Sequence, residues 1–105
     1  MNMIYTHSDI QNAVQIFQNC YMIHYKLGET KKNYYCGITN DVDERKELHN
    51  VEDFLVVIEC DSFDTSSAIE SALQADGFNV GASAGHGRNN SVYVYMYKIT
   101  SSTRQ

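Results

Sequence analysis

The chain has 105 residues, of which 43% are apolar and 20% are charged, with no proline and no tryptophan. This length suits a single domain, and the composition excludes a disordered chain, a collagen and a coiled-coil rod. The longest run of side chains without polar atoms, Phe54 to Ile58, has five residues, far below the roughly 20 that a membrane span needs. Because residues 1–5 also lack the features of a signal peptide, we predict one cytoplasmic domain over residues 1–105 that contacts no membrane.

The formal net charge is −5, from 13 acidic and 8 basic residues. Proteins that bind nucleic acid are typically basic overall or carry a basic stripe. Contact with DNA would therefore depend on a few local cations, and we expect weak non-specific affinity. The three cysteines, Cys20, Cys36 and Cys60, lack CxxC spacing and are odd in number, which favours reduced, buried thiols over disulfides or a zinc site.

The first half of the chain predicts a helix followed by two strands. Ser8 and Gln11 have capping-box spacing, and an apolar stripe at helical spacing follows, so we expect a helix over 8–19. From Tyr21 to Leu27 the pattern alternates with a period of two, and a second extended run covers 34–38. The polar segment 28–33 between them predicts an antiparallel hairpin with Tyr25 and Tyr35 on one side.

The second half predicts two helices and two strands. Asn40 or Asp41 can cap a helix that ends near residue 50. A strand over 54–60, covered on both faces, comes next, and then a helix over 67–76 stopped by Gly77. A glycine-rich loop covers 81–90, a strand covers 91–99, and residues 101–105 are expected to fray. The order α-β-β-α-β-α-β predicts an α+β sandwich, a central, mostly antiparallel sheet flanked by helices.

Chemistry is suggested first by Arg45 and His49, which are four residues apart and so lie on one side of a helix. A guanidinium beside an imidazole can hold a phosphate and move a proton. A solvated helix face with two polar residues by chance is the alternative, favoured by spacing alone. Taken alone, the tyrosines on strands indicate packing.

The string from Tyr35 to Asn50 adds to this evidence. Its Tyr-x-Gly, the Thr two residues later, the Asn-Asp pair, Arg45 and His49 resemble the second signature of the GIY-YIG nuclease superfamily, above all its small single-domain bacterial members. Tyr25-x-Leu27 is similar to part of the first signature, although His24 stays open for its tyrosine. The resemblance covers 21–50; the region 64–79 resembles the family's metal-binding helix region in architecture only.

The resemblance implies a small endonuclease that hydrolyses phosphodiester bonds in DNA with one divalent ion, Mg²⁺ or Mn²⁺. Tyr25 and Tyr35 would surround the attacking water, one of them as base. Arg45 would stabilise the phosphate charge and His49 would assist proton transfer. Glu70, the only acidic residue inside the predicted helix before its last turn, would hold the metal.

An alternative is a catalytically weak or inactive domain of the same fold that binds a protein partner or a second copy of itself. It is favoured by the net charge and by Glu44, which stands where most family members carry a basic residue, and by Ile23 and Cys36, which depart from the two signatures. Such a chain would suit an accessory protein of a phage or mobile element. The alternating tyrosines of the last strand (Tyr93, Tyr95, Tyr97) would form its docking surface.

The glycine-flanked run Gly85-His86-Gly87-Arg88 has two interpretations. Its backbone donors could hold a phosphate, or it is a plain loop, which we favour.

Overall fold

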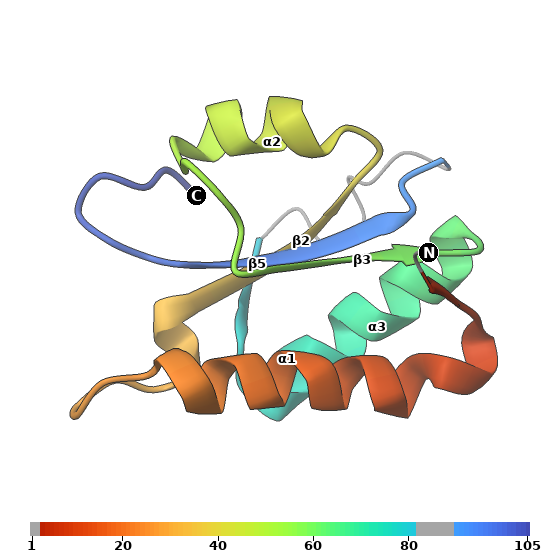
Figure 1. Cartoon of the computed structure of the whole chain (residues 1–105), viewed down its shortest axis with the longest axis horizontal. Coiled ribbons are helices and arrows are strands. Elements are labelled where there is room, and N and C mark those ends of the chain that lie inside the picture. Colours follow the sequence, from red (N-terminus) through yellow and green to blue (C-terminus); the bar gives the residue numbers. More distant parts are fainter. Residues whose placement is uncertain (1–2, 82–89) are drawn as a thin grey trace.

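A mixed five-stranded sheet forms the middle of three layers, with one helix on one face and two on the other (Figure 1). The computed structural model describes residues 3–81 and 90–105. The strands are β1 (Ile4–Tyr5), β2 (Tyr34–Thr39), β3 (Val56–Cys60), β4 (Asn79–Val80) and β5 (Tyr93–Lys98). The helices are α1 (Ile10–His24), α2 (Val42–His49) and α3 (Phe63–Asp76), with short 3-10 turns η1 (His7–Asp9) and η2 (Lys31–Asn33). The expected α+β sandwich is confirmed.

The sheet has the strand order β1-β3-β5-β2-β4. The central strand, β5, pairs antiparallel with both β2 and β3, whereas β1 and β4 pair in parallel with β3 and β2 at the two edges. The predicted hairpin between 21–27 and 34–38 is wrong. The antiparallel neighbour of β2 comes from the far end of the chain, with Tyr35 opposite Tyr97 and Gly37 opposite Tyr95.

The hairpin fails because α1 continues to His24, five residues beyond the expected end. Tyr21 extends the apolar stripe at helical spacing and packs edge-on against Tyr34 and Phe78, with ring centroids 5.3 and 6.0 Å apart. The alternation from Tyr21 to Leu27 therefore does not reflect a strand. Ile23 and Leu27 are largely exposed instead of lining a sheet face.

Several other boundaries also differ from the expectation. The N-terminal capping interaction joins Thr6 and Asp9, whose carboxylate accepts from the Thr6 N–H at 2.8 Å, instead of Ser8 and Gln11. The third helix begins at Phe63, with Ser62 as its cap, and the sequence pattern did not predict β1 or β4. β3 is not covered on both faces, because Val57 is exposed.

Three local expectations are confirmed. Asp41 caps α2 by accepting from the Glu44 N–H at 3.1 Å, and Gly77 ends α3 with a left-handed φ of 115°. The three cysteines are free, two of them buried and Cys20 half-buried. No helix in the described part of the chain is long and apolar enough to cross a membrane.

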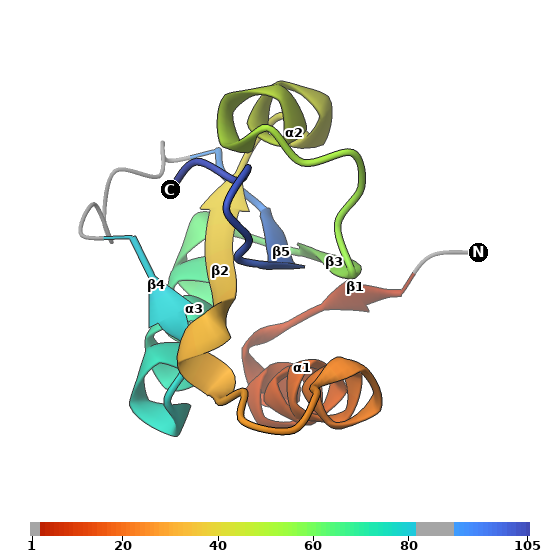
Figure 2. The same ribbon diagram turned by 90° about the vertical axis from the view of Figure 1, so that its left-hand side faces the viewer.

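The two faces of the sheet bury different side chains. Odd and even strand residues point to opposite faces, so Tyr34, Cys36, Val94 and Met96 join α1 and α3 in one apolar core. Tyr35, Tyr95 and Tyr97 point to the other face, where α2 covers them together with Phe54. Figure 2 shows α2 and the C-terminal residues on this second face and α1 on the first.

Candidate functional site

The loop between β2 and α2 fixes the direction of the helix. The buried Thr39 hydroxyl donates to the Asp41 carbonyl at 3.1 Å and accepts from the Asp41 N–H at 3.0 Å. Asp41 in turn caps the helix, with its carboxylate at the positive end of the helix dipole. This short, doubly bonded connection holds α2 against the sheet, so that Arg45 and His49 face the tyrosines below.

His49 is buried, and both of its ring nitrogens have partners. Nδ1 lies 2.5 Å from the carbonyl oxygen of Arg104 and 3.0 Å from the Tyr97 hydroxyl, and Nε2 lies 2.8 Å from the Tyr95 hydroxyl. Burial lowers the pKa of His49, and the positive charge of Arg45 lowers it further, although the hydrogen bond to the Arg104 carbonyl acts in the opposite direction. His49 is therefore neutral at pH 7.

Tyr95 can occupy its position only because residue 37 is a glycine. A Cβ on Gly37, its partner across the strands, would overlap the Tyr95 hydroxyl and lie 2.6 Å from Cζ. The Tyr95 ring stacks on Phe54 with centroids 4.3 Å apart, and the side chain is 1% exposed. The glycine of the Tyr-x-Gly sequence in β2 is therefore required by the tyrosine of β5.

Arg45 supplies a positive charge to this cluster. Its side chain is half-buried, and its Nε atom is buried without a hydrogen-bond partner in the described part of the chain. Burial raises the pKa of Tyr35 and of Tyr95, while the Arg45 charge acts against this increase at both hydroxyls. An incompletely satisfied guanidinium beside two tyrosines is suited to binding an anion such as a phosphate.

Glu70 lies on α3, which covers the face of the sheet opposite α2. Its side chain is 6% exposed, and its carboxylate makes no hydrogen bond within the described residues. Burial raises its pKa to about 7. Its charge raises the pKa of Cys36 on one face of the sheet and of Tyr35 and Tyr95 on the other. The Glu70 charge therefore acts on both tyrosines, although no hydrogen bond joins it to them in the described part of the chain.

The expectation for Tyr25 is wrong. Tyr25 lies just after the last residue of α1, is exposed, and stacks on Tyr21 with centroids 5.0 Å apart. Tyr21 in turn contacts Tyr34, which points away from Tyr35 because neighbouring strand residues face opposite sides. His24, the alternative, ends the same helix. Neither residue lies on the side of the sheet where Tyr35 and His49 meet.

The structure thus brings Tyr35, Arg45 and His49 together with Tyr95, which sequence reasoning did not choose as a site residue. It places Glu70 on α3, the helix on the opposite face of the sheet. The signal that could have identified Tyr95 was the alternation of the last strand, because each face of an alternating strand inside a sheet packs against another layer of the fold. The same burial makes Tyr95 and Tyr97 unsuitable as the docking surface proposed from the sequence. The run from Gly85 to Arg88 lies outside the described residues.

The donor set at Glu70 fits one weakly held divalent ion. No group of three or more His, Cys, Asp or Glu side chains in the described residues forms a metal cage. Mg²⁺ does not require such a cage, because it commonly keeps several waters and binds through one or two carboxylates plus substrate phosphates. A single carboxylate that makes no hydrogen bond within the described residues, such as that of Glu70, is suited to this coordination.

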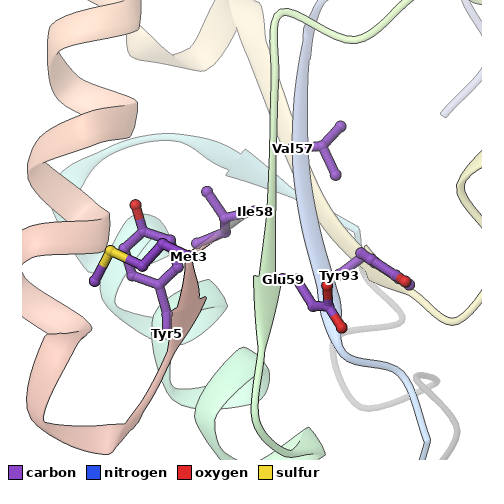
Figure 3. Close-up of a pocket in the computed structure, with 6 residues that line it drawn as sticks. All are labelled: Met3, Tyr5, Val57, Ile58, Glu59 and Tyr93. Carbon is purple, nitrogen blue, oxygen red and sulfur yellow. The ribbon is translucent and has the colours of Figure 1, made fainter. Parts of the chain in front are cut away.

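The cavity in Figure 3 lies away from this cluster. It has a volume of about 330 Å³ and opens at the edge of the sheet between β1 and β3. It is lined by Met3, Tyr5, Val57, Ile58, Glu59 and Tyr93.

Comparison with known proteins gives no match: no family model, no curated protein and no solved structure is significantly similar to this chain.

Proposed function

We propose that this protein is a divalent-metal-dependent endonuclease that hydrolyses phosphodiester bonds in DNA. The observation that carries the proposal is the buried Nε of Arg45, which has no hydrogen-bond partner in the described part of the chain, beside the buried Tyr95–His49 pair. Structural sites seldom leave a buried guanidinium nitrogen unsatisfied, because this costs desolvation energy. Functional sites do so where a ligand completes them.

The resemblance to the GIY-YIG superfamily is kept within this proposal, with one change. The strand antiparallel to the second-signature strand is β5 instead of a strand just before β2. Tyr95 then takes the role that the resemblance implied for Tyr25. The partner strand comes later in the chain than the family pattern implies, but it still carries a tyrosine near Tyr35 for this role.

The side chains divide the chemistry as follows. Arg45 binds the phosphate and neutralises the charge that develops on it. The attacking water gives its proton to the Tyr95 oxygen as the Tyr95 proton passes to Nε2 of His49, which has no other donor (Nε2–Oη distance 2.8 Å). Tyr35, whose ring lies 5.1 Å from that of His49, orients the water with its hydroxyl.

Glu70 would hold the divalent ion, which when bound supplies Lewis-acid stabilisation to the phosphate and the leaving oxygen. The raised pKa of Glu70, about 7, means that its carboxylate is easily protonated in the absence of a cation. Metal binding is therefore expected to be stronger above pH 7 than below it.

The test compares cutting by the wild-type protein, Glu70→Gln and Arg45→Ala. Supercoiled plasmid, branched oligonucleotides and single strands are incubated with Mg²⁺, Mn²⁺ or EDTA. We expect metal-dependent cutting that falls at least about 100-fold in each variant. Thermal unfolding adds a readout without catalysis: Mg²⁺ should raise the Tm of the wild-type protein and leave that of Glu70→Gln unchanged.

Two matched controls separate the site from the net charge. Glu47→Gln changes the charge as Glu70→Gln does, but at an exposed position of α2. Lys46→Ala removes a cation next to Arg45 whose ion pair, with Asp53 at 3.2 Å, lies outside the cluster. Both should retain cutting. Equal losses in the controls and the site variants would overturn the assignment of the site.

A second function is favoured by the charge around α2. Asp43, Glu44 and Glu47 on the helix, with Glu52 and Asp53 after it, are exposed. Such a surface repels a DNA backbone and favours a cationic protein partner. If the folded protein cuts none of the substrates, we propose an inactive domain that binds a basic protein through this surface.

A further inference from the structure

The last six residues are bound to the end of α2 instead of being frayed. Arg104 donates its N–H to the His49 carbonyl at 2.7 Å, and the Asn50 side-chain amide donates to the Ser102 carbonyl at 2.9 Å. His49 and Asn50 are the last helical residue of α2 and its left-handed cap, where carbonyls and side chains are free to bond. The segment thus occupies a helix end that water would otherwise solvate.

A turn within the segment sets where Arg104 lies. The Thr100 N–H donates to the Thr103 hydroxyl, and this hydroxyl lies within hydrogen-bonding distance of both the Thr100 carbonyl and the Gln105 Oε1, all at 3.0 Å. The Tyr97 hydroxyl, 3.1 Å from Gln105 Oε1 and 3.3 Å from the Arg104 carbonyl, links the turn to β5. The turn and the Tyr97 hydroxyl together therefore fix the position of the Arg104 carbonyl.

Nδ1 of His49 has two neighbours, the Arg104 carbonyl at 2.5 Å and the Tyr97 hydroxyl at 3.0 Å, and of these only the carbonyl determines which way the hydrogen bond runs, because the hydroxyl can donate or accept. A carbonyl oxygen can only accept, so an Nδ1 atom 2.5 Å away must carry the proton. In a neutral imidazole the other nitrogen then has a lone pair, and the Tyr95 hydroxyl must donate to it. The direction of the Tyr95–His49 hydrogen bond is thus decided 55 residues away in the sequence.

We propose that the segment Thr100–Gln105 is a positioning element, whose Arg104 carbonyl holds His49 in the Nδ1–H tautomer and leaves Nε2 as the acceptor for the Tyr95 hydroxyl. The tautomer is a property of the resting protein and does not depend on catalysis. The effect on turnover rests on the proposed function, in which Nε2 receives the proton. Without this carbonyl, Nδ1 keeps the Tyr97 hydroxyl and Nε2 keeps the Tyr95 hydroxyl as neighbours. Each hydroxyl can accept as well as donate, so both tautomers are allowed.

The experiment reads the tautomer directly. Protein with ¹⁵N-labelled histidine is examined by long-range ¹H–¹⁵N correlation spectroscopy in EDTA, and the His49 signals are identified among the four histidines by their loss in His49→Gln. We expect the Nδ1–H pattern in the wild-type protein. A variant lacking Arg104 and Gln105 should show exchange between tautomers, whereas Arg104→Ala, which keeps the carbonyl, should be unchanged.

A second variant covers the case in which the shortened chain fails to fold. One glycine inserted between Thr103 and Arg104 keeps every side chain and displaces the carbonyl, and it should also release the tautomer. An Nε2–H pattern in the wild-type protein would overturn the proposal. So would an unchanged Nδ1–H pattern in a folded deletion or insertion variant.

Turnover separates this proposal from the proposed function. If the wild-type protein cuts DNA, the deletion should lower kcat about 10- to 100-fold with little change in KM, and Arg104→Ala should retain kcat. A fixed tautomer in a protein that cuts nothing would refute the nuclease and leave the positioning role standing. Cutting that is equally fast without a fixed tautomer would refute the positioning role alone.

Discussion

The two faces of the sheet are built by different rules. On the face covered by α1 and α3, the core is formed by apolar aliphatic, aromatic and sulfur-containing residues, with Phe17, Ile69 and Leu73 fully buried. On the face covered by α2, they are tyrosines, a histidine and a phenylalanine, whose polar atoms need partners. An apolar face tolerates changes that keep its volume, whereas a polar aromatic face depends on each hydrogen bond. We therefore expect substitutions on the face covered by α1 and α3 to change mainly the free energy of unfolding. Substitutions on the face covered by α2 should change mainly the positions and hydrogen bonds of the tyrosines and His49.

The largest effect is expected on the apolar face. Phe17→Ala should lower the free energy of unfolding by about 3–5 kcal/mol, because it leaves a large cavity between α1 and the sheet. Leu27→Ala is the control, since Leu27 is fully exposed and should change stability very little. Urea denaturation of both variants measures the difference. Similar stabilities would mean that α1 contributes little to this core.

Glu70 should make stability depend on pH in an unusual direction. Its pKa is raised from 4.5 to about 7 on folding, so the unfolded chain loses this proton first as pH rises. The free energy of unfolding therefore falls between pH 4.5 and 7, by at most about 3 kcal/mol, and is constant above that range. Glu70→Gln lacks this loss.

Denaturation of the wild-type protein and of Glu70→Gln at several pH values in EDTA measures the effect. The difference in favour of the variant should grow from pH 4.5 to 7 and then level off. Parallel pH profiles would show that the Glu70 carboxylate is better solvated than its burial indicates.

Gly37→Ala tests the dependence of one strand on the other on the α2 face. The new methyl group would lie 2.6 Å from Cζ of Tyr95, so the ring must move. We expect a loss of about 1–3 kcal/mol from overpacking and a broken bond between Tyr95 and His49. Denaturation gives the first quantity and the His49 nitrogen shifts give the second. Retention of the wild-type shifts would mean that the ring adjusts without leaving His49.

The smallest effect is expected from Tyr97→Phe. The variant removes a hydroxyl that bonds to the segment 100–105 and to Nδ1 of His49, and it keeps the ring that stacks on Tyr35. We expect a loss of about 1 kcal/mol and faster amide exchange at residues 103–105. Tyr34→Phe, which removes a bond to Glu29 on the opposite face, should leave that exchange unchanged. Equal amide exchange in both variants would show that contacts other than the Tyr97 hydroxyl hold the segment 100–105 in place.

Features that depend on neighbouring residues could be predicted from the sequence. The cap at Asp41, the stop at Gly77 and the placement of Arg45 and His49 on one helix face each depend on residues within one or two turns. Glu70 also lies on the helix where the sequence placed it. The prediction of a strand over 21–27 failed because the segment 21–24 fits both the helical and the strand period. Only the contact of Tyr21 with Tyr34 and Phe78 selects the helix.

The sequence by itself determined the α+β class, the helix that carries Arg45 and His49, and the acidic net charge, because these follow from local spacing and composition. Only the tertiary structure decided which tyrosine lies beside Tyr35, since any alternating strand has the local features needed to pair with β2. It also decided that Arg104 orients His49. Both outcomes depend on contacts between residues roughly 55 to 60 positions apart, and the pairing energy of such distant residues is not contained in the local sequence pattern.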